Sequence, residues 1–154
     1  MSGTGLALPL LIGSGVYAAW SDLRFRRLPN AMTMSVAMLG LVVAAIEAGP
    51  ASVIGNLLHV LAALTGGLGL YALGVIGGGE VKYYAAVSAW FGIDSWAYLL
   101  AGVSLAGLLL ASFWIAMSRL SGRGVQADPD SDFAKIPFGL AIATGAVVAA
   151  WVAP

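Results

Sequence analysis

Long apolar segments, separated by short polar or glycine-rich breaks, run through the entire chain. One break is the basic turn at residues 24–30, where Pro29 favours an extended residue before it and a helix start after it. Another break is the glycine triplet at residues 77–79. Segments of this length and apolarity are typical of membrane-spanning helices. We predict spans at about residues 6–22, 30–47, 53–76, 80–94, 96–118 and 136–153.

The fourth segment is short for a span. Its apolar part, residues 81–91, gives about 16 Å of helix, against about 30 Å for the hydrocarbon core of a bilayer. If it crosses, all seven Lys and Arg residues lie on one side of the membrane, whereas otherwise Arg119, Arg123 and Lys135 lie on the other. The positive-inside rule favours crossing. We predict six spans, with both termini outside, the cations in the cytoplasm and the fourth helix inside the bundle.

The composition agrees with a membrane protein and excludes other classes of protein. Hydrophobic residues make up 60% of the chain and charged residues 9%, and the mean hydropathy is +0.95. We therefore expect one all-α, polytopic membrane domain over residues 1–154, surrounded by the lipid bilayer. The net charge is zero and no basic stripe is present, so nucleic acid is not an expected partner. Without cysteine, the chain has neither disulfides nor a thiolate metal site.

Two acidic residues lie at the ends of predicted spans. Asp22 ends the first span, and Glu80 begins the fourth directly after the glycine triplet. A charged side chain in the membrane costs about 2.5 to 3.5 kcal/mol on insertion scales, so it indicates function with a partner. The predicted topology puts both acids at one cytoplasmic depth, and we expect each to be the other's partner. If the two acids have no catalytic role, Asp22 would form an ion pair with Arg24 or Arg26, and Glu80 would stabilise a helix N-terminus.

Paired carboxylates indicate a specific chemistry. When two carboxyl groups lie close together they share a proton, so one acts as a base and the other as an acid. The base activates a water and the acid protonates the substrate carbonyl, which is the logic of aspartic peptidases. This chemistry needs neither a metal nor a cofactor, and we predict none. The glycines before Glu80 permit positive φ and let an extended substrate backbone approach the acid.

Three motifs carry a resemblance to a known family. They are Ser-Asp-Leu-Arg-Phe-Arg-Arg-Leu-Pro-Asn at residues 21–30, Gly-Gly-Gly-Glu-Val-Lys at residues 77–82 and Ile-Pro-Phe-Gly-Leu-Ala-Ile-Ala at residues 136–143. In order, spacing and membrane placement the chain resembles the type IV prepilin leader peptidases, and most of all the short branch that serves Flp-type, tight-adherence pili. The resemblance implies a fold like that of the GxGD-type intramembrane aspartic proteases, in the bacterial inner membrane, with its active site facing the cytoplasm.

The resemblance also implies roles for individual residues and partners. Asp22 matches the first catalytic carboxylate, and Glu80 stands at the place of the second. The other matched positions are expected to bind substrate or shape the site: Asn30, Gly77, Gly78, Gly79, Lys82, Pro137 and Gly139. The implied partners are a prepilin or pseudopilin substrate and the pilus assembly machinery.

The chain departs from the family pattern at Glu80, where the family has Asp. The additional methylene moves the carboxylate by roughly 1 Å, and a misplacement of that size can cost about 100-fold in rate. Three explanations stay open: a natural variant whose site accommodates Glu, an inactive relative, or an engineered substitution. An inactive relative would bind prepilin or act as a pilus-assembly partner. Besides an enzyme and a binding protein, a transporter is a third possible class. Transporter sites tend to lie near the membrane midplane, however, and these acids are predicted at the ends of their spans.

Overall fold

The computed structural model of the chain describes residues 5–25, 27–120 and 138–153. These residues form six α-helices and one short 3-10 helix, η1, and contain no β-strand, which confirms the all-α prediction. The elements are α1 (Ala7–Phe25), α2 (Asn30–Ala48), α3 (Ser52–Ala72), α4 (Gly78–Ser88), η1 (Ile93–Ser95), α5 (Trp96–Leu120) and α6 (Phe138–Val152).

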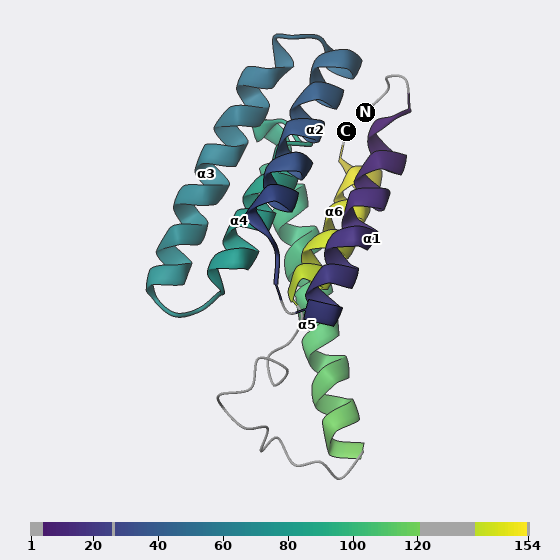
Figure 1. Cartoon of the computed structure of the whole chain (residues 1–154), viewed down its shortest axis with the longest axis vertical. Coiled ribbons are helices and arrows are strands. Elements are labelled where there is room, and N and C mark those ends of the chain that lie inside the picture. The colour runs from purple at the N-terminus through teal and green to yellow at the C-terminus, as the bar shows by residue number, and fades with distance from the viewer. Residues whose placement is uncertain (1–4, 26, 121–137, 154) are drawn as a thin grey trace.

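Successive helices run in opposite directions, so the bundle has two distinct ends (Figure 1). The start of α1 and the end of α6 lie at one end. The end of α1 and the starts of α2, α4 and α6 lie at the other, which α5 overhangs. The alternation therefore gathers Asp22, Glu80 and Gly139 at a single end of the molecule, although they are far apart in the sequence.

The short helix α4 lies inside the bundle, where it packs on α2, α3 and α6. Its side chains Val81, Tyr83 and Val87 are each about 1% exposed. Glycines on the neighbouring helices make room for it: a Cβ at Gly67 would lie 2.7 Å from Cγ1 of Val81. Close approach through small residues is the usual way in which membrane helices pack. The burial of α4 agrees with the position that we expected from its length.

Glycines also bring α6 against its two other neighbours. A Cβ at either Gly102 of α5 or Gly145 of α6 would overlap the facing backbone. On the other side, a Cβ at Gly15 of α1 would lie 3.3 Å from Cβ of Ala143. Helix α6 is therefore held tightly between α1 and α5, which fixes the position of its first turn.

Within the described residues, three stretches of helix are long and apolar enough to cross a membrane: Asn30–Ala48, Ser52–Ala72 and Ile93–Met117. Helix α6 is apolar but shorter. Large apolar side chains on the outer surface, such as Met34, Ile54 and Leu108, are about two-thirds exposed, at 67%, 67% and 66%. A surface of this kind suits lipid and not water. The chain is a membrane protein, and the crossing of all six helices stays a prediction.

Two helices, α3 and α4, end well before the predicted spans do. The third span was expected to reach residue 76, but α3 ends at Ala72. There Val75 donates its N–H to the carbonyl of Leu70, and Gly74, with φ +72°, donates to that of Tyr71. This pattern is a Schellman motif, which terminates a helix at a glycine in the left-handed region.

The fourth predicted span, residues 80–94, is interrupted. Helix α4 ends at Ser88, and a turn leads into η1. Two α3 side chains satisfy carbonyls in this turn: Asn56 donates to the oxygen of Ala89 at 2.8 Å, and Nδ1 of His59 donates to that of Phe91 at 3.0 Å. The helix can stop within the bundle because buried polar partners replace its missing backbone bonds.

Candidate active site

Asp22 lies near the end of α1 and is only 8% exposed. Its Oδ2 accepts a hydrogen bond of 2.9 Å from the N–H of Gly139, in the first turn of α6. The first N–H groups of a helix have no partner within the helix, and the helix dipole favours a negative charge there. A Cβ at residue 139 would lie 2.7 Å from Asp22 Oδ2, so the contact requires glycine.

The turn after α1 holds Asp22 at this depth. Ser21, the residue before it, donates from Oγ to the carbonyl oxygen of Arg27 at 2.8 Å. Pro29 has the extended conformation, with ψ 143°, and α2 begins at the next residue. The chain therefore reverses immediately after Asp22, because the Ser21 bond closes the turn and Pro29 directs the start of α2.

Glu80 lies in the first turn of α4, directly after the glycine triplet. Its Oε2 accepts a hydrogen bond of 2.9 Å from the N–H of Gly77. This bond is one of the two that make up a capping box. The second would need a side-chain acceptor at residue 77, and glycine has none. The interpretation of Glu80 as a helix-stabilising acid is therefore consistent with the structure, and it does not exclude a catalytic role.

The surroundings of the two acids meet at the first turn of α6. Glu80 lines a cavity together with Phe138, and Phe138 immediately precedes the glycine that binds Asp22. Helix α6 packs on both α1 and α4, which carry the two acids. The structure thus brings Asp22 and Glu80 to one end of the bundle and to one helix start. The approach of their carboxyl groups to a common water stays a prediction.

Asn30 and Lys82 are in direct contact. Nζ of Lys82 donates to Oδ1 of Asn30 at 3.1 Å, across 52 residues of sequence. The bond joins the first residue of α2 to the start of α4, two residues beyond Glu80. Both positions were singled out from the sequence without a defined role. Their contact indicates that they fix α4, and with it Glu80, relative to the turn that follows Asp22.

The glycine triplet does not provide the backbone freedom that we expected. None of its members is among the positive-φ glycines of the described residues, which are Gly5, Gly49 and Gly74. Gly78 and Gly79 already belong to α4, and a Cβ at Gly79 would lie 3.7 Å from Cβ of Leu28, an ordinary contact. The left-handed turn lies instead at Gly74. Pro137, another predicted site residue, lies outside the described residues.

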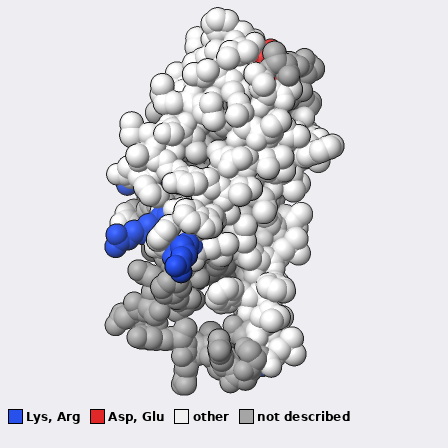
Figure 2. Space-filling model, turned by 45° about the vertical axis from the view of Figure 1, so that its right-hand side comes forward, with Lys and Arg blue, Asp and Glu red and all other residues white. Residues whose placement is uncertain are grey.

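The end of the bundle that carries the acids is cationic. The described Lys and Arg residues all lie at this side of the molecule: Arg24 and Arg119 near the ends of α1 and α5, Arg27 in the turn between α1 and α2, and Lys82 near the start of α4. Figure 2 shows the visible cations gathered there, away from the opposite end. At that opposite end, Glu47 accepts hydrogen bonds from the N–H groups of Leu6 and Ala7 at 2.9 and 3.1 Å.

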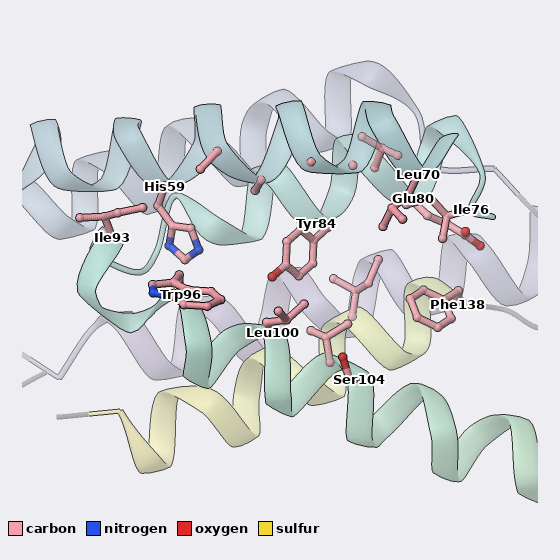
Figure 3. Close-up of a pocket in the computed structure, with 17 residues that line it drawn as sticks. His59, Leu70, Ile76, Glu80, Tyr84, Ile93, Trp96, Leu100, Ser104 and Phe138 are labelled. Atoms are coloured by element: carbon pink, nitrogen blue, oxygen red, sulfur yellow. The ribbon is translucent and has the colours of Figure 1, made fainter. Parts of the chain in front are cut away.

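A cavity of about 610 Å³ extends from Glu80 along the interior face of the bundle. Its lining comes mainly from α3, α4, α5 and α6, with Ile76 and Ile93 of the connecting segments, and is almost entirely apolar. Figure 3 shows Glu80 and Phe138 at one end, His59 and Trp96 at the other, and Tyr84 between them. Neither this cavity nor the role of Asn56 was predicted from the sequence, although the polar residues at positions 56 and 59, three apart on an apolar helix, were a signal.

The chemistry of the side chains gives no support for a metal centre. Among the described residues, no three His, Cys, Asp or Glu side chains form a group that could hold a metal ion. His59 is 2% exposed and is hydrogen-bonded to the backbone carbonyl of Phe91, so it acts as a packing residue within the bundle.

Fold and site together define an α-helical membrane protein with two acidic side chains at one cationic end of its bundle. Residues 10–112, more than half of the chain, match the type IV leader peptidase family. The chain belongs to this family of proteases, which confirms the family predicted from the motifs, whereas the Flp-type branch stays a prediction. The matched region contains Asp22 and Glu80 and ends before α6. Comparisons with curated proteins and with solved structures found no match.

Proposed function

We propose that this protein is a membrane aspartic endopeptidase that removes the leader peptide from type IV prepilins or pseudopilins. Its substrates would be of the Flp, tight-adherence type, and cleavage would take place at the cytoplasmic face. One observation carries the proposal: Asp22 binds the first turn of α6, and Glu80 shares a cavity with that same turn. The family gives the reaction class, and this arrangement gives the candidate dyad.

The chemistry requires one proton shared between the two acids. The ionised carboxylate takes a proton from a water, and the oxygen of that water attacks the scissile carbonyl carbon. The protonated carboxyl donates to the carbonyl oxygen, which gives a neutral tetrahedral intermediate. Collapse of this intermediate breaks the C–N bond, and the amine leaves with a proton returned by the dyad. Atoms and charges balance without a metal or a covalent intermediate.

The orientation follows from charge. All four described cations lie at the end of the bundle that carries the acids. Under the positive-inside rule that end faces the cytoplasm, in a bacterial inner membrane. A substrate with a basic leader and an apolar helix would hold its leader at the same surface. Partitioning of the helix into the bilayer would then bring the scissile bond to the depth of the carboxylates.

The direct test is cleavage of a co-expressed Flp-type prepilin, read as a mobility shift on a gel. The chain, its Glu80→Asp form and its Asp22→Asn form are compared. Cleavage by the chain that is lost in Asp22→Asn supports a protease that uses Glu. Cleavage only after Glu80→Asp indicates a scaffold inactivated at one position. Absence of cleavage in every form, with folding verified, contradicts the proposal.

A second candidate is an inactive homologue or engineered variant that binds prepilin or serves as a pilus-assembly partner. The observation that favours it is the bond between Glu80 and Gly77, which gives Glu80 a structural role at the start of α4. Binding of a prepilin without cleavage, unchanged in Asp22→Asn, would support this candidate. Cleavage by the unmodified chain would exclude it.

A further inference from the structure

The cavity beside Glu80 is a groove between two helices that hardly meet. Helix α3 packs on α2 and α4, and α5 packs on α6, but α3 and α5 have no extensive contact with each other. The side chains Leu70 and Leu100, from α3 and α5, line the cavity and are 44% and 46% exposed. The groove is therefore open to the surroundings between these two helices, which in a membrane means to lipid.

The two ends of the groove differ. Glu80 and Phe138 lie at the end that carries the candidate dyad, whereas Ile93 of η1 and Trp96 lie at the other (Figure 3). Along α3, the lining runs from His59 to Leu70, which is about 16 Å at the rise of an α-helix. The groove thus begins at a candidate catalytic acid and continues for about three turns of helix along the membrane normal.

The floor of the groove on α3 consists of small residues: Ala62, Ala63, Gly66 and Gly67. No atom lies within 4 Å of a Cβ built at Gly66. Elsewhere in this bundle, as at Gly102 and Gly145, small residues bring helices together. At Gly66 the same kind of surface faces an open space of the right length.

We propose that this groove receives the apolar helix of the substrate, over about its first eleven residues after the scissile bond. The inference rests on the proposed peptidase function and names the binding site for that helix. Eleven residues of a helix about 10 Å in diameter occupy roughly 1300 Å³. The cavity of about 610 Å³ would therefore enclose roughly half of such a helix and leave the other half in lipid.

Charge favours a peptide helix over a phospholipid in the same place. The carboxylate of Glu80 lines the end of the groove where a lipid headgroup would place its phosphate. Two anions placed this close together repel each other. A peptide entering the groove presents a neutral amide at this depth, and that amide is the bond to be cut.

Tyr84 adds a polar contact one turn along from Glu80. Its ring lines the groove, and its hydroxyl group has no hydrogen-bond partner among the described residues (Figure 3). The first N–H groups of the substrate helix also lack partners within that helix. Tyr84 is therefore a positioning residue, whose oxygen accepts from the first turn of the bound helix and fixes its register against the dyad.

The test is photocrosslinking in vesicles of phosphatidylcholine and phosphatidylglycerol. A benzoylphenylalanine is placed at residue 66, in an Asp22→Asn background that holds uncut substrate. The probe substrate is a synthetic precursor with a basic leader and a 20-residue apolar helix. The matched control is the same substitution at Gly69, which is also on α3 with no atom within 4 Å but does not line the groove. We expect crosslinks to the precursor from position 66 and not from position 69.

A kinetic measurement gives a second readout. In the chain or its Glu80→Asp form, Gly66→Phe fills the groove and should slow cleavage of the precursor about tenfold or more, because the phenyl ring occupies the space of the substrate helix. Gly69→Phe should leave the rate unchanged. Crosslinks from position 66 to lipid alone, or an unchanged rate in Gly66→Phe, would overturn the groove assignment.

These outcomes separate the two proposals. If no form cleaves the precursor but position 66 still crosslinks to its helix, the groove assignment stands and the peptidase function fails. If the chain cleaves the precursor and its Gly66→Phe form cleaves it at the same rate, the peptidase function stands and the groove assignment fails. Circular dichroism of each variant verifies that it is folded.

Discussion

Helix α5 packs closely on α6 but stands apart from α3, although glycines are present in both places. On the α6 side, a Cβ at Gly102 would overlap the backbone at Gly145. On the α3 side, Gly66 faces an open groove. The same residue type closes one interface and leaves the other open. The difference indicates that the closed interface positions the start of α6, beside Asp22, and that the open one admits a ligand.

The largest effect is expected at the first turn of α6, where the helix that the closed interface holds meets Asp22 of α1. In Gly139→Ala the new methyl group would displace the carboxylate of Asp22, which lies 2.7 Å from its position. A displacement of about 1 Å should lower the cleavage rate about 100-fold. Rates are measured with the prepilin gel assay.

The matched control for this prediction is Gly69→Ala, because its methyl group enters open space and residue 69 does not line the groove. Cleavage by this control should stay close to the rate of the unmodified chain. Equal rates in the two variants would show that the contact between Asp22 and α6 does not position the acid.

The next effect is on stability. Gly102→Leu forces a side chain into the α5–α6 contact, which should destabilise the fold by about 1–3 kcal/mol. Gly66→Leu adds the same atoms to the groove and should change stability by less than about 0.5 kcal/mol. Thermal unfolding in detergent, followed by circular dichroism, measures both. Equal destabilisation would mean that the groove is closed in solution and that the comparison fails.

The smallest effect is expected at Tyr84. Tyr84→Phe removes one hydroxyl group from the groove without changing its shape. Loss of one hydrogen bond to the substrate should lower kcat/KM about three- to tenfold. Tyr98→Phe, which removes a hydroxyl group outside the groove, is the control. An unchanged kcat/KM in Tyr84→Phe for a precursor that carries the apolar helix would contradict the positioning role of Tyr84.

The sequence predicted the helices well because apolar length and polar breaks decide them. Proline before α2 and the basic turn after Asp22 are local signals, and the structure has a reversal at that point. The early end of α3 also has a local signal, Gly74. The predicted span nevertheless ended at residue 76, because the glycine triplet at residues 77–79 is the more conspicuous break. A glycine ends a helix where its φ is positive, and this conformation depends on the bonds that follow it.

Contacts between distant helices could not be predicted in the same way. The motifs identified Asp22, Gly139, Asn30 and Lys82 as site residues, but nothing in the sequence showed that they bind each other in pairs. The groove is less predictable still, since it results from two helices that fail to meet. Sequence patterns describe the surface of one helix, whereas an open space depends on the placement of several.

The most direct test of the central claim is the proximity of the two acids. The chain has no cysteine, so Asp22→Cys with Glu80→Cys gives a clean pair for a short bismaleimide crosslinker in native membranes. Asn30→Cys with Lys82→Cys, a pair already in contact, is the positive control. Glu47→Cys with Glu80→Cys, at opposite ends of the bundle, is the negative control. The dyad predicts efficient crosslinking between positions 22 and 80. A crosslink in the positive control without one between positions 22 and 80 would contradict it.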